Sequence, residues 1–212
     1  MSTIEISDHK QVRTIRQYYR WQSKIYDATR WSFLFGRNLI IKCLPLDVNG
    51  KYRILEVGCG TGHNLRNLAL HFPNARITGL DASADMLAIA RSRTRQFPER
   101  IQLVEKPYAL GEEGFREQYD LVLFSYSLTM INPQWEELLQ QACKDLKPGG
   151  FIAVVDFHDS RFNWFKRHMG RNHVRMDGHL LPELRQLYKS VFVRIFKAYA
   201  GAWEYVLFVG RK

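Results

Sequence analysis

The residues with the clearest chemical potential form a glycine-rich stretch, EVGCGTG, at positions 56–62. It follows a predicted buried strand (RILEV, 53–57) and precedes a predicted helix, so its glycines lie at a strand-to-helix turn. Glycine permits a tight turn and a close approach of the backbone to a ligand. The spacing matches neither the G-x-G-x-x-G pattern that binds a pyrophosphate nor a phosphate-binding loop that ends in Gly-Lys-Ser/Thr. With an acid at Glu56, the stretch favours a ligand that carries an ammonium group and a ribose but no phosphate.

Asp81 is the second candidate binding residue. It follows the second predicted strand (RITGL, 76–80), nineteen residues after Gly62. A carboxylate at this point of a doubly wound fold can accept hydrogen bonds from both ribose hydroxyls. The alternative is that Asp81 caps a helix that begins near Ala84, and the loop upstream favours the ribose role. Beside it we expect two more residues of the binding site, Ala82 and Met86, with Met86 against an adenine, although a Met at helical spacing is also typical of a core.

The rest of the chain predicts the elements that position these residues. Helices are predicted at 64–72, 84–97, 135–146 and 179–188, the third being stopped by the Lys-Pro-Gly-Gly of 147–150. The alternation of strands and helices predicts an α/β fold whose sheet is doubly wound and mostly parallel. The last two strands have no helix between them, only a turn at 200–202, which predicts an antiparallel edge. The strands are predicted at 53–57, 76–80, 101–105, 119–125, 151–157, 191–199 and 203–210.

A chain of 212 residues without a linker or repeat is expected to form one domain, 1–212. Residues 50–212 make up its core, and the aromatic, arginine-rich residues 1–48 are expected to form a helical cap or lid. There is no apolar run long enough to span a bilayer and no secretory signal, so the expected location is the cytoplasm. The three cysteines are far apart, which favours reduced thiols and disfavours a metal site.

The net charge of +10 is concentrated at the two ends of the chain. Residues 1–42 carry a net +5 and residues 160–212 a net +8, whereas residues 43–159 carry −3. Such flanks suit an anionic partner, and the basic aromatic segment 161–168 is typical of binding at a membrane surface. A solvated basic face is the alternative. A nucleic acid is not expected, because no nucleic-acid-binding module is recognisable.

The motifs LEVGCGTG, GLDAS, YDLVLFSYSL and LKPGG together resemble the class I S-adenosylmethionine-dependent methyltransferases over roughly residues 50–160. The resemblance implies a seven-stranded, Rossmann-like sheet with S-adenosylmethionine as cofactor. Glu56 and the glycines would lie near its methionine part. Many members carry an acid after the third strand, near the amine of the adenine. Here Glu105 is expected to be displaced from that role, which leaves the ring of Tyr108 to hold the adenine. The residues predicted to bind the cofactor are Glu56, Gly58, Cys59, Gly60, Gly62, Asp81, Ala82, Met86, Tyr108, Phe124 and Ser125.

A narrower resemblance rests on the flanks. The segments YYR (18–20), IYDATRWSFLFGR (25–37), VDFHD (155–159) and HVRMDGH (173–179) are similar to the bacterial enzymes that trimethylate diacylglyceryl-homoserine to a betaine lipid. The phosphatidylethanolamine N-methyltransferases are similar but less close. A lipid amine would then be the acceptor, reached by a protein bound peripherally to the inner face of the membrane. Its homoserine carboxylate would pair with Arg30, Arg37 or Arg175.

Methyl transfer to an amine needs close approach, the exclusion of water and the prior loss of a proton. His158 or Asp159, just after the fifth strand, could accept that proton. The rings of Tyr19, Tyr26 and Tyr126 could stabilise the growing positive charge. Two alternatives remain open from the sequence: a soluble small-molecule methyltransferase, and a cofactor-binding protein without turnover. The oligomeric state is not predicted.

Overall fold

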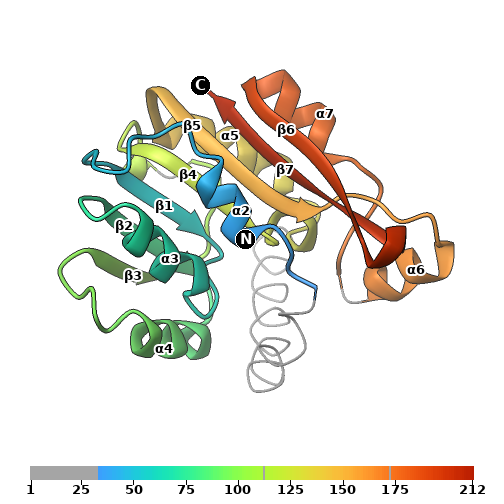
Figure 1. The fold of residues 1–212 in the computed structure, drawn as a ribbon, viewed down its shortest axis with the longest axis horizontal. Helices are drawn as coiled ribbons and strands as arrows, with labels where there is room; N and C mark the ends of the chain where they lie inside the picture. The colour runs from blue at the N-terminus through green and yellow to red at the C-terminus, as the bar shows by residue number, and fades with distance from the viewer. Residues whose placement is uncertain (1–32, 112, 172) are drawn as a thin grey trace, which may run out of the picture.

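The computed structural model describes residues 33–111, 113–171 and 173–212. Seven strands form one sheet in the order β3-β2-β1-β4-β5-β7-β6 (Figure 1). The strands β1 to β5 are parallel, and β7 runs antiparallel to both β5 and β6. This confirms the predicted mostly parallel sheet with an antiparallel edge. The strands are β1 (Arg53–Val57), β2 (Arg76–Asp81), β3 (Ile101–Glu105), β4 (Tyr119–Ser125), β5 (Leu146–Phe157), β6 (Lys189–Ala198) and β7 (Trp203–Arg211).

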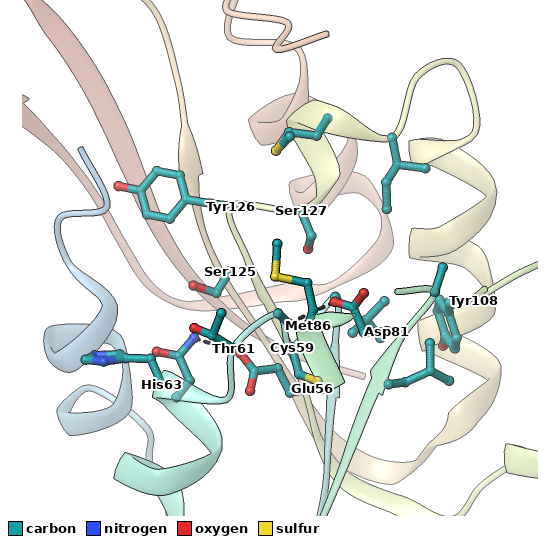
Figure 2. Close-up of a pocket in the computed structure, with 18 of the residues that line it drawn as sticks. Glu56, Cys59, Thr61, His63, Asp81, Met86, Tyr108, Ser125, Tyr126 and Ser127 are labelled. Atoms are coloured by element: carbon teal, nitrogen blue, oxygen red, sulfur yellow. Dashed lines mark hydrogen bonds between the residues drawn. The ribbon is translucent and has the colours of Figure 1, made fainter. Parts of the chain in front are cut away.

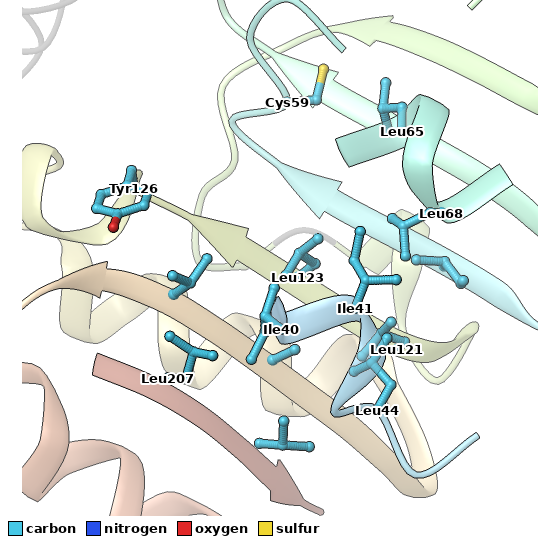
Figure 3. Close-up of a cluster of buried hydrophobic side chains, with 14 of the residues drawn as sticks. Ile40, Ile41, Leu44, Cys59, Leu65, Leu68, Leu121, Leu123, Tyr126 and Leu207 are labelled. Carbon is cyan, nitrogen blue, oxygen red and sulfur yellow. The ribbon is translucent and has the colours of Figure 1, made fainter. Parts of the chain in front are cut away.

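Helices cover both faces of the sheet, because the central strands are buried along nearly their whole length. In β4, Leu121 and Leu123 belong to one buried cluster, with α2 and α3, while Val122 and Phe124 belong to a second, with α5 and α7. Figure 3 shows Ile40 and Ile41 of α2 lying over the first of these faces. The α-helices are α2 (Arg37–Lys42), α3 (His63–His71), α4 (Ala84–Arg93), α5 (Trp135–Asp145), α6 (Asn163–Arg171) and α7 (Leu180–Leu187).

Short 3-10 turns complete the connections. They are η1 (Glu113–Phe115), η2 (Leu128–Met130) and η3 (Tyr199–Gly201). The last of them joins β6 to β7, where the sequence predicts a turn, and its backbone has positive φ angles at Tyr199, Ala200 and Gly201. None of the described helices is long and apolar enough to cross a membrane.

Two predicted boundaries were wrong. Helix α4 ends at Arg93 rather than near residue 97, because the hydroxyl of Thr94 donates to the carbonyl oxygen of Ala90 at the helix end, 2.8 Å away. Strand β5 begins at Leu146, directly after α5, and includes the Lys-Pro-Gly-Gly segment. Gly149, at φ +76°, accommodates the irregular stretch, where the pairing with β4 shifts between Tyr119 and Leu121.

Of the predicted helical cap at 1–48, the described residues include the segment that leads into α2 and that helix itself. Three residues given roles from the sequence, Tyr19, Tyr26 and Arg30, lie outside the described residues.

Candidate functional site

A cavity of about 330 Å³ lies at the carboxyl edge of the parallel strands. Its walls come from the segments after β1, β2, β3 and β4 and from α2. The order of the sheet changes direction between β1 and β4, and open α/β sheets bind their ligands at such a point. Figure 2 shows Tyr126 and Ser127 on one side of the cavity, Glu56 and His63 on another, and Tyr108 at the far end.

The glycine-rich loop is fixed by the neighbouring strand. The amides of Gly58 and Cys59 both donate to the carbonyl oxygen of Leu80 at the end of β2, at 2.8 and 3.0 Å. Gly58 has a φ of +69°, and a Cβ there would lie 2.9 Å from the Cβ of Ser127. Glycine is therefore required at this position, both by backbone conformation and by the close approach of the segment after β4.

The carboxylate of Asp81 is held in place by two backbone amides. One oxygen accepts from Gly60 at 2.8 Å and the other from Ser83 at 2.9 Å. Burial raises the pKa of Asp81, and these amides act against that rise. The cap of α4 is Ser83, whose hydroxyl accepts from the amide of Met86 at 3.4 Å, so Asp81 does not take the capping role considered as its alternative. An ionised carboxylate can accept about four hydrogen bonds, so acceptor capacity remains for a hydroxyl.

Glu56 has the most unusual surroundings of the acids that line the cavity. It is 2% exposed, and one of its oxygens accepts from the side-chain amide of Asn64 at 2.7 Å. Burial raises its pKa to about 8, against the opposing influence of Asn64 and of the nearby charge on Arg37. The other oxygen, Glu56 Oε2, is buried without a hydrogen-bond partner among the described residues, as is Asn64 Oδ1. Two unmatched acceptors side by side suit a ligand rich in N–H donors, such as an ammonium group.

The opposite end of the cavity is formed after β3. Lys106, Pro107 and Tyr108 line it, together with Met86 of α4. The hydroxyl of Tyr108 donates to Asp145 at 2.5 Å, which leaves its ring in the wall of the cavity. Glu105 is exposed and does not line the cavity, in agreement with its predicted displacement. Pro107, Tyr108 and Met86 give this end largely apolar side chains, which suits an aromatic base.

Ser125, Tyr126 and Ser127 form the wall that follows β4. Tyr126 has a φ of +55°, and its hydroxyl donates to the carbonyl oxygen of Phe35 at 2.8 Å. Burial raises its pKa well above the ordinary value, so it remains a neutral phenol. The hydroxyls of Ser125 and Ser127 are buried without a partner among the described residues. They are available to a ligand.

A buried carboxylate that the sequence analysis did not single out organises this wall. Asp156, fully buried at the end of β5, accepts from the amide of Leu128 at 3.0 Å and from the hydroxyl of Thr129 at 2.5 Å. Burial raises its pKa to about 6, and these donors act against that rise. A single acid in the apolar run FIAVVDF was the signal that could have identified it.

With His158 counted as the suggested base, the structure covers fifteen of the predicted site residues, and eleven of these line the cavity. Lining the cavity are Arg37, Glu56, Gly58, Cys59, Gly60, Asp81, Ala82, Met86, Tyr108, Ser125 and Tyr126. Gly62 instead caps α3 against Ala90, and Phe124 is a core residue whose ring packs on Tyr108.

His158 and Arg175 also lie outside the lining of this cavity. The ring of His158 lies against Gly178, and the guanidinium of Arg175 pairs with Asp177 at 2.8 Å. Asp159, the other suggested base, forms an ion pair with Lys166. Their proposed roles in proton transfer and carboxylate binding remain predictions.

Several lining residues were not predicted. Two of them, His63 and Asn64, directly follow the glycine motif, and that position on the first turn of a helix was a usable signal. Others depend on contacts between distant segments, which one sequence does not reveal; an example is Arg93, which donates to the hydroxyl of Thr61 at 2.7 Å. The lining residues missed by the sequence analysis include Thr61, His63, Asn64, Arg93, Lys106, Ser127, Met130 and Ile131.

Among the described residues there is no cluster of three or more His, Cys, Asp or Glu side chains suited to a metal ion. Comparison with known proteins bears on the glycine loop and the acids beside it. Residues 55–152 match the family model described as "Methyltransferase domain".

Two relatives of known name extend the match beyond residues 55–152. A malonyl-[acyl-carrier protein] O-methyltransferase of Acetivibrio thermocellus is 25% identical over 172 residues, which are 80% of this chain and 59% of that protein. A demethylmenaquinone methyltransferase of Tropheryma whipplei is 30% identical over 158 residues, 72% of this chain and 63% of that protein. The chain thus matches about three fifths of the length of these relatives.

The fold of this chain also occurs in solved structures. The 1,6-didemethyltoxoflavin-N1-methyltransferase of Burkholderia thailandensis superposes with a TM-score of 0.73 at 15% identity, covering 96% of this chain and 89% of that one. At this identity the likeness concerns the fold alone. None of these three proteins has a name that refers to a betaine lipid, so the narrower resemblance stays a prediction.

Proposed function

We propose that this protein is an S-adenosylmethionine-dependent methyltransferase that acts on a small molecule. The observation that carries the proposal is the pair of unmatched buried acceptors, Glu56 Oε2 and Asn64 Oδ1, in a cavity built by the glycine loop. The amino group of the cofactor supplies the donors that this pair lacks. The methyltransferase-domain match over the same loop supports the assignment.

The remaining lining residues fit the other parts of the cofactor. Asp81, already oriented by two amides, is suited to the ribose hydroxyls. Tyr108 and Met86 form an apolar wall for the adenine. Arg37, whose charge lies close to Glu56, is suited to the carboxylate of the methionine part. This is a different role from the one predicted for Arg37 in holding a substrate carboxylate.

S-adenosylmethionine supplies a methyl group on a positively charged sulfur, and the protein has little acid–base chemistry to perform. The lone pair of the acceptor atom forms the new bond to carbon while the carbon–sulfur electron pair returns to sulfur. The walls after β4 would hold the acceptor through Ser125 and Ser127 and exclude water. Asp81 and Glu56 face the cofactor's part of the cavity, so neither serves as the base.

The acceptor we favour is a small molecule rather than a bilayer lipid. The named relatives act on a malonyl group carried by acyl-carrier protein and on demethylmenaquinone. These names support a small, partly apolar acceptor, and Met130 and Ile131 in the wall of the cavity are consistent with it. Trimethylation of diacylglyceryl-homoserine, or methylation of phosphatidylethanolamine, stays as a narrower prediction from the sequence.

Product mass spectrometry tests the proposal. The purified protein is incubated with S-adenosylmethionine and separate acceptors: a demethylated quinone, a free malonyl thioester, and vesicles that contain diacylglyceryl-homoserine or phosphatidylethanolamine. We expect methyl gain on a small acceptor. Gain on the homoserine lipid alone would replace the small-molecule substrate with the lipid. Calorimetry with S-adenosylhomocysteine in parallel tests the site itself, and a failure to bind would reject the proposed function.

A further inference from the structure

Helix α6 differs from the other α-helices of the described residues in that it buries no residue. Its inner side is partly buried, with Phe165 and Met169 packed against the core. Its outer side carries Trp164, Arg167, His168 and Arg171 at a spacing of three and four residues, which places them on one face. Trp164 is 62% exposed, an unusual position for so large an apolar side chain.

The charge of this segment has a single sign. Residues 161–171 include four Lys or Arg residues and no Asp or Glu. Asp159, just before the segment, pairs with Lys166, whereas Arg161, Arg167 and Arg171 are exposed. The guanidinium of Arg161 lies 4.6 Å from the ring centre of Phe162. The outer face of α6 is therefore cationic around one large aromatic ring.

The other exposed aromatic residues are gathered at the same edge. The Phe, Tyr and Trp side chains that are exposed among the described residues are Phe33, Phe35, Trp164 and Tyr199. The ring of Tyr199 in η3 lies 6.2 Å from Phe33 and 5.5 Å from Phe35. We call these four residues, with Arg161, Arg167 and Arg171, the aromatic edge.

Hydrogen bonds join the two parts of the aromatic edge. The hydroxyl of Ser160, just before α6, donates to the carbonyl oxygen of Ala202, just after η3, at 2.7 Å. The amide of Glu204 donates to the carbonyl oxygen of Asp159, also at 2.7 Å. Figure 1 shows α6 and the β6–β7 turn next to each other, beyond the carboxyl end of β5.

The aromatic edge also adjoins the cavity. Leu34 lines the cavity, while its neighbours Phe33 and Phe35 are exposed. A surface that binds through this edge would therefore lie beside the segment that closes one side of the site.

We propose that the aromatic edge binds the surface of an anionic lipid bilayer. Large aromatic rings partition into the headgroup region, and Arg side chains on the same face are attracted to anionic lipids. Exposed rings beside a cationic helix face fit a broad surface better than a single strand of nucleic acid, which binds in a groove where successive bases stack. The proposal concerns location and goes beyond methyl transfer, so it stands whether or not the acceptor is a lipid.

Vesicle co-sedimentation of the full chain tests this inference. Vesicles of phosphatidylcholine alone are compared with vesicles that also contain phosphatidylglycerol, at low and high salt. We expect binding to the anionic vesicles only, weakened by salt. The double variant Arg167→Gln/Arg171→Gln should bind about 25-fold more weakly, or about fivefold for each charge removed. Trp164→Ala should lose about tenfold through its buried ring area.

The matched control is Arg91→Gln/Arg95→Gln, which removes the same charge from exposed positions at the end of α4. It should bind the anionic vesicles as the unmodified protein does. Equal losses of vesicle affinity in both double variants would mean that binding depends on net charge alone, and would overturn the proposal. So would equal binding to both vesicle types, or binding of single-stranded RNA that the α6 variants lose while vesicle binding is absent. Affinity for S-adenosylhomocysteine, measured on the same samples, separates these results from a failure of the cofactor site.

Discussion

Two walls of the cavity are built by different kinds of contact. The wall of the glycine loop and Asp81, proposed for the cofactor, is called the cofactor end, and the wall after β4, proposed for the acceptor, is called the acceptor end. At the cofactor end, the backbone amides of the loop are fixed by β2: Gly58 and Cys59 donate to the carbonyl oxygen of Leu80, and Gly60 donates to the carboxylate of Asp81. At the acceptor end, the wall after β4 is held by side chains and by segments that are distant in the sequence. Asp156 holds the turn after β4, the hydroxyl of Tyr126 reaches Phe35, and the amide of Arg175 donates to Thr129 at 2.9 Å.

This difference means that the residues of the glycine loop must stay constant, whereas those of the wall after β4 are free to change. A loop fixed by backbone amides tolerates changes elsewhere, since it needs only its glycines and one acid. A wall fixed by side chains and by the segment 173–179 can be reshaped by substitutions that leave the sheet intact. Such a division suits a fold in which one cofactor serves many acceptors, because function is decided at the site rather than by the fold.

The largest expected effect is at the cofactor end. Asp81→Ala removes an acceptor of two ribose hydrogen bonds, and we expect the affinity for S-adenosylhomocysteine to fall by about 100-fold or more, from two charge-assisted bonds. Isothermal calorimetry measures it. Asp85→Ala, an exposed acid on the first turn of α4, is the matched control and should bind normally. Unchanged affinity of the Asp81 variant would remove Asp81 from the site.

The next largest effect is expected for Asp156, the buried carboxylate at the acceptor end. Asp156→Asn places an N–H group against the donors of Leu128 and Thr129, and should lower the free energy of unfolding by about 2 kcal/mol. Chemical denaturation gives this value. If the two ends are independent, cofactor affinity stays within about twofold while turnover falls. A comparable loss of cofactor affinity would show that the ends are coupled, contrary to the comparison above.

Glu56→Gln keeps the shape of the side chain but removes its ability to ionise when an ammonium group binds beside it. We expect about tenfold weaker binding of the cofactor, because one charge-assisted hydrogen bond to its amino group is lost. Calorimetry compares the Glu56 variant with Glu183→Gln. Glu183 is an acid on the first turn of α7 that does not line the cavity. Binding as tight as in the unmodified protein would assign Glu56 to structure alone.

The same variant makes a prediction about pH. Below about 4.5 Glu56 is protonated in both the folded and the unfolded chain, and above about 8 it is ionised in both. Between these values only the folded chain keeps the proton, so this group's contribution to stability falls as pH rises. Relative to the unmodified ligand-free protein, Glu56→Gln should therefore gain stability across that range, on the order of 4 kcal/mol in total. Denaturation curves at several pH values measure the gain, and a constant difference contradicts it.

The smallest effect is expected at Ser127. Its hydroxyl has no partner among the described residues, so Ser127→Ala should leave the free energy of unfolding within about 0.5 kcal/mol. The KM for the acceptor should rise by about threefold to tenfold, the value of one neutral hydrogen bond. Steady-state kinetics with the acceptor identified by mass spectrometry measure this. Ser92→Ala, at an exposed position on α4, is the control.

The fold and the cofactor end were predictable because their signals are local. The strands β1, β3 and β4 have the predicted bounds, since short apolar runs between turns mark buried parallel strands. The loop at 56–62 carries its chemistry within seven residues. The C-terminal end of α4 and the start of β5 were missed because the bond from Thr94 to Ala90 and the shifted pairing of β4 with β5 leave no trace in the periodicity of the sequence.

The acceptor end was less predictable for the same physical reason. Ser127, Met130 and Ile131 reach the cavity only because the turn after β4 is held by Asp156, about thirty residues later in the chain. His158 was chosen for its place after β5, yet the chain turns its ring toward Gly178. Which side chains face a cavity depends on such distant contacts, whereas which strands form depends mainly on neighbours in sequence.

The contact between Gly62 and Ala90 has a consequence for how this chain can evolve. A Cβ on Gly62 would lie 3.0 Å from the Cβ of Ala90 and 3.1 Å from its Cα, and Gly62 has a φ of +77°. Neither residue can grow while α3 and α4 keep their spacing, so we expect both positions to remain small in descendants of this sequence. A lineage that enlarged Ala90 would have to shift α4, and with it Met86 in the cavity wall. Two small residues that do not line the cavity, Gly62 and Ala90, thus limit how far the shape of the cavity can change during evolution.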